Sequence, residues 1–178
     1  MTCAAAFSSD SAAETRRIAA CLGAAIDPVP RGGFVVGLHG DLGAGKTVFA
    51  GGLIGALGVA AGTVIASPTF TVFRSYRGRA LIEHVDAYMV HSREALEGAG
   101  LHEIQGNGHV TCVEWAERIA DALPKDRIDV DLEALPHDAN RLDVAPPRRI
   151  EARAGGPVSA RIFERWLALV VTAGSRVS

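Results

Sequence analysis

The sequence predicts an α/β fold organised around a phosphate-binding loop, as one domain over residues 1–178. Residues 40–47 read G-D-L-G-A-G-K-T and fit the phosphate-loop pattern G-x-x-x-x-G-K-[ST] at every fixed position. A short apolar run over residues 34–39 precedes the loop and suits a buried strand, while apolar residues recur at helical spacing over 48–57. A chain of 178 residues is long enough to bury most of its apolar surface as one domain.

Before the loop, the sequence predicts a helix over residues 12–25. Ser11 and Glu14 have the spacing of a capping box, with a hydroxyl at the N-cap and a carboxylate three residues later. Prolines and glycines over 28–33 are expected to end this helix and lead into the strand. Its buried face is expected to hold Ile18, Cys21, Leu22 and Ala25.

After the loop, the sequence predicts an antiparallel hairpin. Ser67-Pro68-Thr69 reads as a loop that leads into a strand, in which Thr71 and Phe73 alternate with their neighbours. Gly78 is a plausible turn, and a second strand is expected over 80–86.

Further along the chain, shorter elements are expected. Residues 92–100 suggest a helix, 104–109 a loop, 110–113 a strand that ends at Glu114, and 116–123 another helix.

The C-terminal part suggests a second hairpin and a final helix. Alternating residues over 127–132 and 141–144 predict the two strands of the hairpin. Ser159 is the expected cap of the last helix, and Trp166 lies on its apolar stripe, where it is expected to enter the core.

The loop residues suit phosphate chemistry. Glycines at 40, 43 and 45 permit positive φ and a close approach of the backbone to an anion, while the helix that follows offers the positive end of its dipole. Lys46, one of only two lysines in the chain, is expected to reach the β and γ phosphates. The Thr47 hydroxyl is expected to bind the magnesium ion that bridges these phosphates. The loop residues expected to bind the nucleotide are Asp41, Leu42, Gly43, Ala44, Gly45, Lys46 and Thr47.

Two carboxylates stand where strands are expected to end. Asp86 follows His84-Val85, and Glu114 follows the apolar run over 110–113. Ligands of open α/β sheets bind at the carboxyl ends of the strands, so both acids are expected to converge on the phosphate loop. Either acid taken singly also fits a surface charge at a strand end.

Three further residues have two interpretations each. Thr69 fits a switch residue that senses the γ-phosphate, and equally a turn set by Pro68. Trp115 either lies near the nucleotide or covers the end of the sheet. His84 would share a strand face with Asp86, but two ligands are too few for a metal site, so a packed histidine is the simpler interpretation.

Composition excludes several classes of protein. The net charge is −2 with 48% apolar residues, and no apolar run is long enough for a membrane span. The N-terminus does not resemble a signal peptide, and three widely spaced cysteines give no disulfide framework or zinc site. We therefore expect a cytoplasmic protein with no membrane and no disulfide partner. Arg148, Arg149 and Arg153 form a small basic patch, which fits a solvated edge.

Four segments together resemble one family. They are G-D-L-G-A-G-K-T at 40–47, S-P-T-F-T at 67–71, H-V-D-A-Y at 84–88 and V-E-W-A-E-R at 113–118. In this order and spacing they resemble the TsaE family, small bacterial ATPases required for the threonylcarbamoyladenosine modification of tRNA. The resemblance runs from the N-terminal helix to about Leu123 and continues more loosely to the end.

The resemblance implies a P-loop NTPase-like three-layer fold, with a central mainly parallel sheet, helices on both sides and added antiparallel strands. It implies ATP and Mg²⁺ as cofactors. The implied partners are TsaD-like and TsaB-like proteins, with tRNA contacted indirectly through their complex, which ATP hydrolysis is thought to reset.

The resemblance also implies site roles. The catalytic residues would be Asp86, which positions or activates water, Lys46, and the switch residue Thr69. Thr47 and Glu114 would hold magnesium, and Trp115 would lie beside the nucleotide.

The chain departs from the family pattern at Val48, Met89 and Ala116, where Thr, Arg and Pro are usual. Met89 removes a cation near Asp86, which bears on partner contact or on the setting of Asp86.

Two other functions fit a phosphate loop. A small-molecule kinase needs a lid with several arginines, and Arg74, Arg77 and Arg79 near one hairpin turn are the nearest candidates. A GTPase normally carries an N-K-x-D sequence, which this chain lacks.

Overall fold

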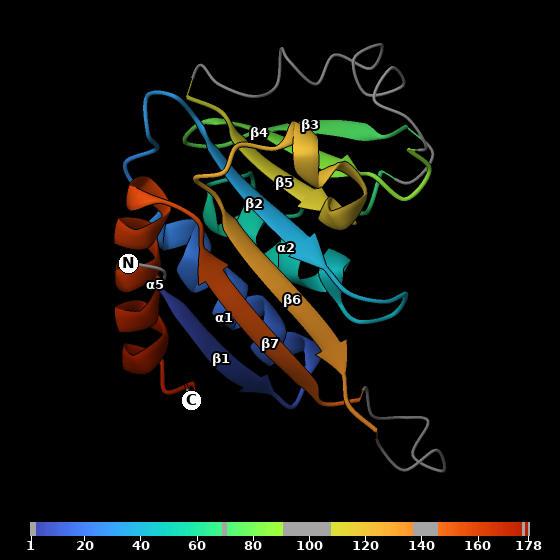
Figure 1. The fold of residues 1–178 in the computed structure, drawn as a ribbon, viewed down its shortest axis with the longest axis vertical. Coiled ribbons are helices and arrows are strands. Elements are labelled where there is room, and N and C mark those ends of the chain that lie inside the picture. The colour runs from blue at the N-terminus through green and yellow to red at the C-terminus, as the bar shows by residue number, and fades with distance from the viewer. Residues whose placement is uncertain (1–2, 69–70, 91–107, 137–145, 176, 178) are drawn as a thin grey trace.

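The structure is a computed structural model that describes residues 3–68, 71–90, 108–136, 146–175 and 177. These residues form a single seven-stranded mixed sheet with helices, in the strand order β1-β7-β6-β2-β5-β4-β3 (Figure 1). The strands are β1 (Ala4–Ser9), β2 (Phe34–His39), β3 (Phe73–Arg77), β4 (Leu81–Asp86), β5 (Val110–Glu114), β6 (Ile128–Ala134) and β7 (Arg148–Ala154). The helices are α1 (Ala12–Ala25), α2 (Lys46–Ala56), the 3₁₀ helix η1 (Ala116–Ala122) and α5 (Pro157–Thr172).

The centre of the sheet is parallel and its edges are antiparallel. β6, β2, β5 and β4 run parallel to one another. β3 pairs antiparallel with β4 at one edge, and β7 and β1 add antiparallel strands at the other. Every residue of β2 and β5 is buried, as expected of parallel strands covered on both faces. The carboxyl ends of the four central strands therefore meet at one edge, where the phosphate loop begins.

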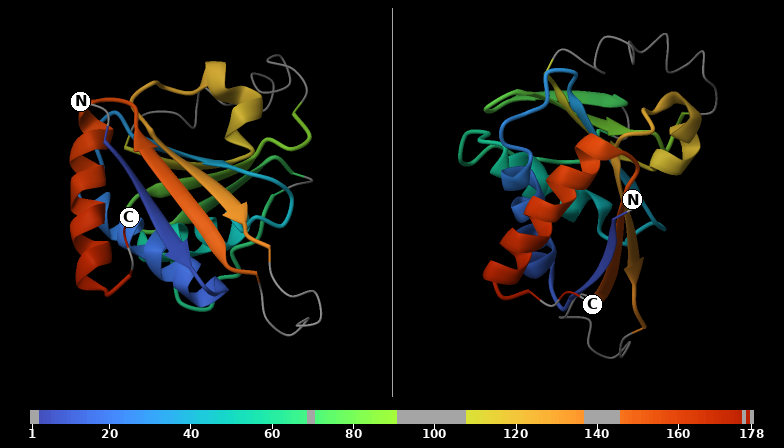
Figure 2. Two further views of the ribbon diagram at one scale, coloured as in Figure 1. Left: turned by 60° about the horizontal axis from the view of Figure 1, so that its bottom comes forward. Right: turned by 60° about the vertical axis from the view of Figure 1, so that its left-hand side comes forward.

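Three helices cover one face of the sheet. α1, α2 and α5 lie together there, and η1 lies on the opposite face against β2 (Figure 2). The expectation of helices on both faces is thus met only in part by the described residues, because η1 alone covers the second face. Along β7, exposed and buried residues alternate, and the exposed ones are charged side chains on this second face.

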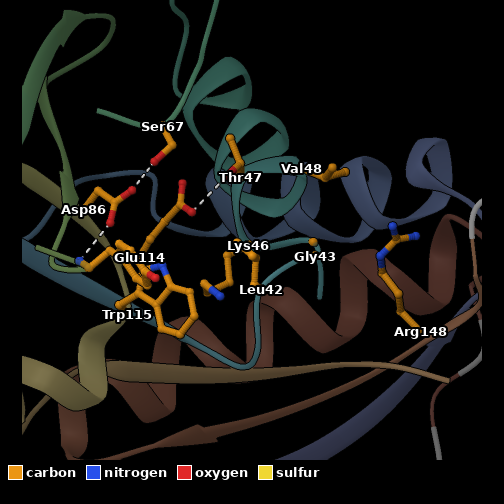
Figure 3. A pocket seen from close by; sticks show the side chains of 12 residues that line it. Leu42, Gly43, Lys46, Thr47, Val48, Ser67, Asp86, Glu114, Trp115 and Arg148 are labelled. Atoms are coloured by element: carbon orange, nitrogen blue, oxygen red, sulfur yellow. Dashed lines mark hydrogen bonds between the residues drawn. The ribbon is translucent and has the colours of Figure 1, made fainter. Parts of the chain in front are cut away.

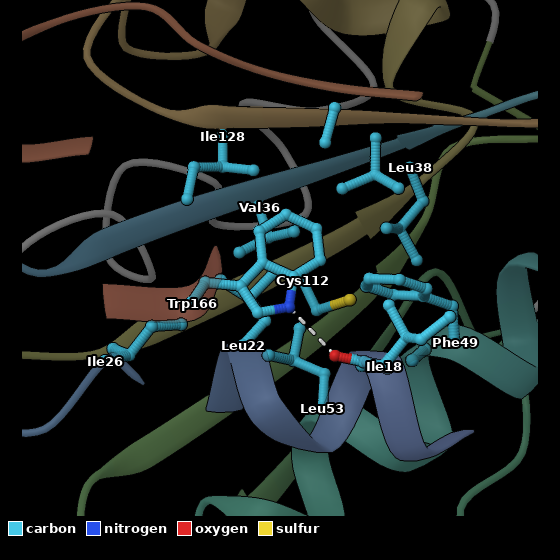
Figure 4. Close-up of a cluster of buried hydrophobic side chains, with 14 of the residues drawn as sticks. Ile18, Leu22, Ile26, Val36, Leu38, Phe49, Leu53, Cys112, Ile128 and Trp166 are labelled. Carbon is cyan, nitrogen blue, oxygen red and sulfur yellow. Dashed lines mark hydrogen bonds between the residues drawn. The ribbon is translucent and has the colours of Figure 1, made fainter. Parts of the chain in front are cut away.

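The largest core residue is Trp166 of α5, which is fully buried as expected. Its ring packs against Phe7 and Phe49, with centroids 4.9 and 6.3 Å away, and its Nε1–H donates to the Ile18 carbonyl at 2.9 Å (Figure 4). The hydrogen bond satisfies the only polar atom that this side chain brings into the core. Trp166 thereby joins α5 to α1, α2 and β1.

Glycines allow α1 and α2 to approach each other closely. A Cβ on Gly23 of α1 would lie 2.5 Å from the Leu53 carbonyl oxygen, and one on Gly52 of α2 would lie 2.3 Å from that of Arg16. Both distances are shorter than any real contact, so each position has room only for hydrogen.

Several predicted elements are confirmed. The α1 helix begins after Ser11, whose hydroxyl accepts a hydrogen bond from Glu14 N at 3.1 Å. The β3–β4 hairpin forms with its turn at residues 78–80. Residues 116–122 form a helix of the 3₁₀ type. The helix predicted over 92–100 lies outside the described residues.

Two predictions about the C-terminal part need correction. The antiparallel partner of β6 is β7 (Arg148–Ala154), whereas residues 141–144, where the sequence predicts the partner strand, fall outside the described residues. Ser159 is the third residue of α5, which begins after Gly156. The carboxylate of Asp126 accepts hydrogen bonds from the amides of Val158 and Ser159, at 2.9 and 2.8 Å, and supplies the cap instead.

The described residues include no helix that is both long and apolar enough to cross a membrane. Cys3, Cys21 and Cys112 are free cysteines. Burial raises the pKa of the Cys112 thiol well above its usual value, and the nearby Glu114 carboxylate adds to this rise.

Candidate functional site

The loop between β2 and α2 requires its glycines. Gly40, Gly43 and Gly45 have φ angles of +123°, +83° and +108°, a region that other residues rarely adopt. A Cβ on Gly40 would also lie 2.1 Å from the Leu132 carbonyl oxygen. No side chain caps α2 at Gly45 within the described part of the chain. The first amides of the helix therefore point into the concave side of the loop, as in an anion-binding nest.

This loop borders a cavity of about 410 Å³ (Figure 3). Its volume lies within the range of small-molecule sites. The cavity stands at the carboxyl ends of β2, β4 and β5, where the sequence places the candidate acids. Residues from the loop and α2, from the segment before β3, and from β4, β5 and β7 line it: Leu42, Gly43, Gly45, Lys46, Thr47, Val48, Ser67, Asp86, Tyr88, Glu114, Trp115 and Arg148.

Glu114 is tied directly to the loop. Its Oε2 accepts a hydrogen bond from Thr47 Oγ1 at 2.9 Å, and its Oε1 lies 2.9 Å from His84 Nε2 (Figure 3 shows the contact with Thr47). The Glu114 carboxylate can only accept, so Nε2 of His84 carries the hydrogen of that bond. His84 Nδ1 is buried without a hydrogen-bond partner in the described residues, which suits the bare lone pair of this tautomer. Both side chains are buried, so His84 holds Glu114 in one orientation toward Thr47.

Asp86 lies beside Glu114 on the neighbouring strand. The parallel register of β4 and β5 pairs these two residues directly. The Asp86 carboxylate accepts a short hydrogen bond from Ser67 Oγ, and its Oδ1 accepts from Tyr88 N at 2.9 Å. Asp86 is 2% exposed, and both carboxylates line the same cavity.

Lys46 is folded back against the loop. Its Nζ donates to the carbonyl oxygens of Gly40 at 2.5 Å and Asp41 at 2.9 Å, and lies 3.5 Å from the centroid of the Trp115 ring. Burial lowers the pKa of the Lys46 ammonium, while the Glu114 carboxylate and other acids oppose this shift. The side chain thus holds a partly desolvated positive charge at the cavity wall, where an anion would be favoured.

Trp115 has a strained backbone beside Glu114. Its φ of +58° is uncommon for a bulky residue. The ring packs on Tyr88, with centroids 5.0 Å apart, and the Arg118 guanidinium lies 5.0 Å from the Tyr88 ring. With this backbone conformation, Trp115 lines the cavity.

His39, at the end of β2, is held between two acids. Its Nε2 lies 2.8 Å from Asp129 Oδ1, and its Nδ1 lies 3.2 Å from Glu117 Oε2. Burial raises the pKa of Asp129, but hydrogen bonds from His39 and Arg127 outweigh burial and hold that pKa below its usual value. These contacts fasten the strand from which the loop begins.

The side chains that line the cavity suit a magnesium ion and a nucleoside triphosphate. A hydroxyl and a carboxylate, Thr47 and Glu114, are hard oxygen ligands of the kind that Mg²⁺ prefers. The described residues contain no cluster of three or more acidic, histidine or cysteine side chains able to hold a metal. Any magnesium here would therefore complete its coordination with phosphate oxygens and water, as is usual for this ion.

The structure brings most of the predicted site residues together. Thr47, Lys46, Asp86, Glu114 and Trp115 all line the cavity, although the roles assigned to them stay predictions. Thr69 lies outside the described residues.

Three residues of the site were missed by sequence reasoning. The sequence indicates only a loop at Ser67 and a packed histidine at His84, with no link to Glu114. Arg148 was grouped with Arg149 and Arg153 as an exposed patch, yet it is only 6% exposed and lines the cavity. The available signal is the alternation along 149–154, where charged residues at 149, 151 and 153 alternate with apolar ones, because this period places Arg148 on the apolar, buried face.

Comparisons with known proteins agree with one another. The family described as "Threonylcarbamoyl adenosine biosynthesis protein TsaE" matches residues 9–142. A TsaE protein from Treponema pallidum is 40% identical over 134 residues, covering 75% of this chain and 93% of its own. A TsaE protein from Bacillus subtilis is 37% identical over 118 residues, covering 66% of this chain and 70% of its own. The crystal structure of YdiB from Bacillus subtilis superposes with a TM-score of 0.70 at 27% identity, over 94% of this chain and 97% of that one.

Proposed function

Because the chain belongs to the TsaE family, we propose that it is a P-loop ATPase subunit required for the threonylcarbamoyladenosine modification of tRNA. The observation that carries this proposal is the hydrogen bond between Thr47 and Glu114 at the mouth of the phosphate loop. It joins the expected magnesium ligand of the loop to an acid at the end of a neighbouring parallel strand. That pairing is the arrangement found in P-loop nucleotide hydrolases.

In this proposal, Lys46 and the loop amides bind the phosphates of ATP. Lys46 Nζ exchanges its contacts with the carbonyls of Gly40 and Asp41 for phosphate oxygens. Such an exchange costs little, since one set of charge-assisted hydrogen bonds replaces another. Trp115, against which Lys46 now rests, would then lie beside the nucleotide.

Thr47 and Glu114 would hold the magnesium ion, which when bound neutralises charge on the phosphates. His84 keeps the Glu114 carboxylate aimed at Thr47 through its Nε2–H. Because this hydrogen bond is buried, it fixes the ligand before the metal arrives and limits reorganisation on binding.

Asp86 would orient or activate the attacking water. Its carboxylate lies one strand away from Glu114 and is itself held by Ser67 Oγ and Tyr88 N. A carboxylate fixed in this way could orient a water near the terminal phosphate. Thr69, between Ser67 and β3, would complete the site as a switch residue, as the family resemblance suggests.

The cellular role proposed here is to reset a TsaD-like and TsaB-like complex by ATP hydrolysis, with tRNA contacted through that complex. The isolated protein would hydrolyse ATP slowly, because its partners complete the active arrangement. The test is ATP turnover by the purified protein alone and with both partners, measured as phosphate release. Stimulation by the partners supports the proposal, while equal rates with and without them contradict the role in the complex.

The small-molecule kinase keeps little support. Arg77 ends β3 and Arg79 lies in the hairpin turn at the amino end of β4, while Asp86 stands at the carboxyl end of β4. Arg79 is committed elsewhere, since it donates to the carbonyls of Ala56 at 2.9 Å and Gly23 at 3.2 Å. Arg79 therefore braces α1 and α2, and neither arginine lines the cavity.

A further inference from the structure

Arg148, the first residue of β7, reaches across the sheet edge to the phosphate loop. Its Nε donates to the Ala44 carbonyl at 3.1 Å, and its Nη1 donates to the Pro146 carbonyl at 3.2 Å. Arg148 also lines the candidate nucleotide cavity (Figure 3). It is the second cationic side chain in the cavity wall, after Lys46.

The positive charge of Arg148 is desolvated and uncompensated. The residue is 6% exposed, and no carboxylate lies within 4.0 Å of its nitrogens in the part of the chain that the structure describes. Its neighbours on β7 differ, because Arg149 pairs with Glu151 and Arg153 pairs with Asp131. Burial lowers the pKa of the Arg148 guanidinium, yet arginine stays charged in proteins. A buried charge without a counter-ion is costly, and a bound anion would remove that cost.

The position of Arg148 indicates which part of a nucleotide it would meet. A Cβ on Gly45 would lie only 2.6 Å from Arg148 Nε, so the guanidinium rests against the loop beside the start of α2. Lys46, Glu114 and Asp86 gather on the other side of the loop, whereas Val48 lies on the side of Arg148 (Figure 3). Since the acids mark the terminal phosphates, Arg148 stands toward the end that carries the α-phosphate.

We propose that Arg148 is a second phosphate-binding cation of this site and contacts the α-phosphate of the nucleotide. The guanidinium has five N–H donors, of which the carbonyls of Ala44 and Pro146 take two, so it can donate to a phosphate while it still braces the loop. Arg148 lies beyond residues 9–142, which the family description matches, so its contribution comes from the C-terminal hairpin. This inference rests on the proposed nucleotide-binding function.

The experiment compares Arg148→Ala and Arg148→Lys with the matched control Arg149→Ala. Arg149 is the next residue on β7, but its side chain is 56% exposed and points away from the cavity. The dissociation constant for ADP and for ATP is measured by calorimetry, and thermal unfolding confirms that each variant is folded. Arg148→Ala is expected to weaken both nucleotides by the same factor, about ten- to a hundredfold, as loss of a charged hydrogen bond predicts. Arg149→Ala is expected to bind like the wild type.

Phosphorus NMR of bound ADP separates a direct contact from a purely structural role. Arg148→Lys is used because it keeps the positive charge and is expected to fold even if Arg148→Ala does not. In this variant the α-phosphorus resonance is expected to shift, and the β-phosphorus resonance is expected to shift less. An unchanged α-phosphorus resonance, or wild-type affinity in a folded Arg148 variant, overturns the inference and leaves nucleotide binding intact. If the wild type and Arg149→Ala bind no nucleotide, the proposed function fails and the inference falls with it.

Discussion

Replacing Lys46 by Ala tests the phosphate site most simply. In the structure its Nζ makes two charge-assisted hydrogen bonds, at 2.5 and 2.9 Å, which ATP phosphates would take over. A hydrogen bond to a charged group contributes about 1.5–3 kcal/mol, so ATP affinity is expected to fall about ten- to a hundredfold. The fold should tolerate the change. Lys46 is only 5% exposed, so its charge is costly to bury, and removing that charge offsets the loss of its hydrogen bonds.

Lys125, the only other lysine, provides the control. It is exposed and precedes β6, whose parallel pairing with β2 puts Lys125 at the end of the sheet opposite the loop. Lys125→Ala should bind ATP like the wild type in calorimetric titrations with magnesium. If folded Lys46→Ala binds ATP as tightly as Lys125→Ala does, the assignment of the loop as the phosphate site is refuted.

The remaining predictions concern the metal, the helix pair and a helix cap. Glu114→Gln should still bind ATP but lose most of its magnesium dependence, and a wild-type magnesium titration would contradict its role as a ligand. Gly52→Ala should lower the free energy of unfolding by about 1–3 kcal/mol because its Cβ would clash with Arg16, whereas Gly51→Ala, with open space around it, should raise that free energy by about 0.5–1 kcal/mol; similar urea midpoints for both variants would refute the close helix contact. Burial raises the pKa of Asp126, but hydrogen bonds from Ser159 and Val158 outweigh it and leave the net pKa below the usual value, so the cap stabilises above the unfolded pKa and is lost as pH falls through the folded one. Asp126→Ala should therefore cost about 1–2 kcal/mol in urea unfolding at neutral pH, and the difference should vanish only well below about pH 4; a constant difference would argue against an ionised cap.

The centre of the fold could be predicted because its signals are local. The phosphate loop, the apolar strand before it and the helix after it all lie within residues 34–56. The approach of Asp86 to Glu114 also follows from a simple rule, since the carboxyl ends of parallel strands share an edge. Both residues line the cavity beside the loop, as expected.

The edge of the sheet could not be predicted because its contacts join distant segments. β1 pairs with β7, so that Phe7 lies opposite Ile150 although the two residues are near opposite ends of the sequence. β1 is also rich in alanine and serine, which favour a strand only weakly. Residue type alone does not distinguish Arg148 from its exposed neighbour Arg149; only the alternation along β7 does, and the register with β6 then brings Arg148 to the loop end of the sheet.

The cap of α5 shows the same limit at smaller scale. Ser159 has the residue type of a cap, but Asp126, in the segment before β6, accepts the hydrogen bonds of the first helical amides. No local sequence pattern predicts a capping residue that lies 32 residues earlier in the chain. In the candidate site, the contact of His84 with Glu114 is equally hard to predict, since the two residues lie on neighbouring strands and are 30 residues apart in the chain.

A crystal structure of the protein with magnesium and a non-hydrolysable ATP analogue tests the central claim most directly. The account predicts phosphates within hydrogen-bond distance of the loop amides and Lys46, a magnesium ion on Thr47 and Glu114, and the γ-phosphate facing Asp86. A nucleotide bound away from this loop, or a metal ion that contacts neither Thr47 nor Glu114, would contradict it.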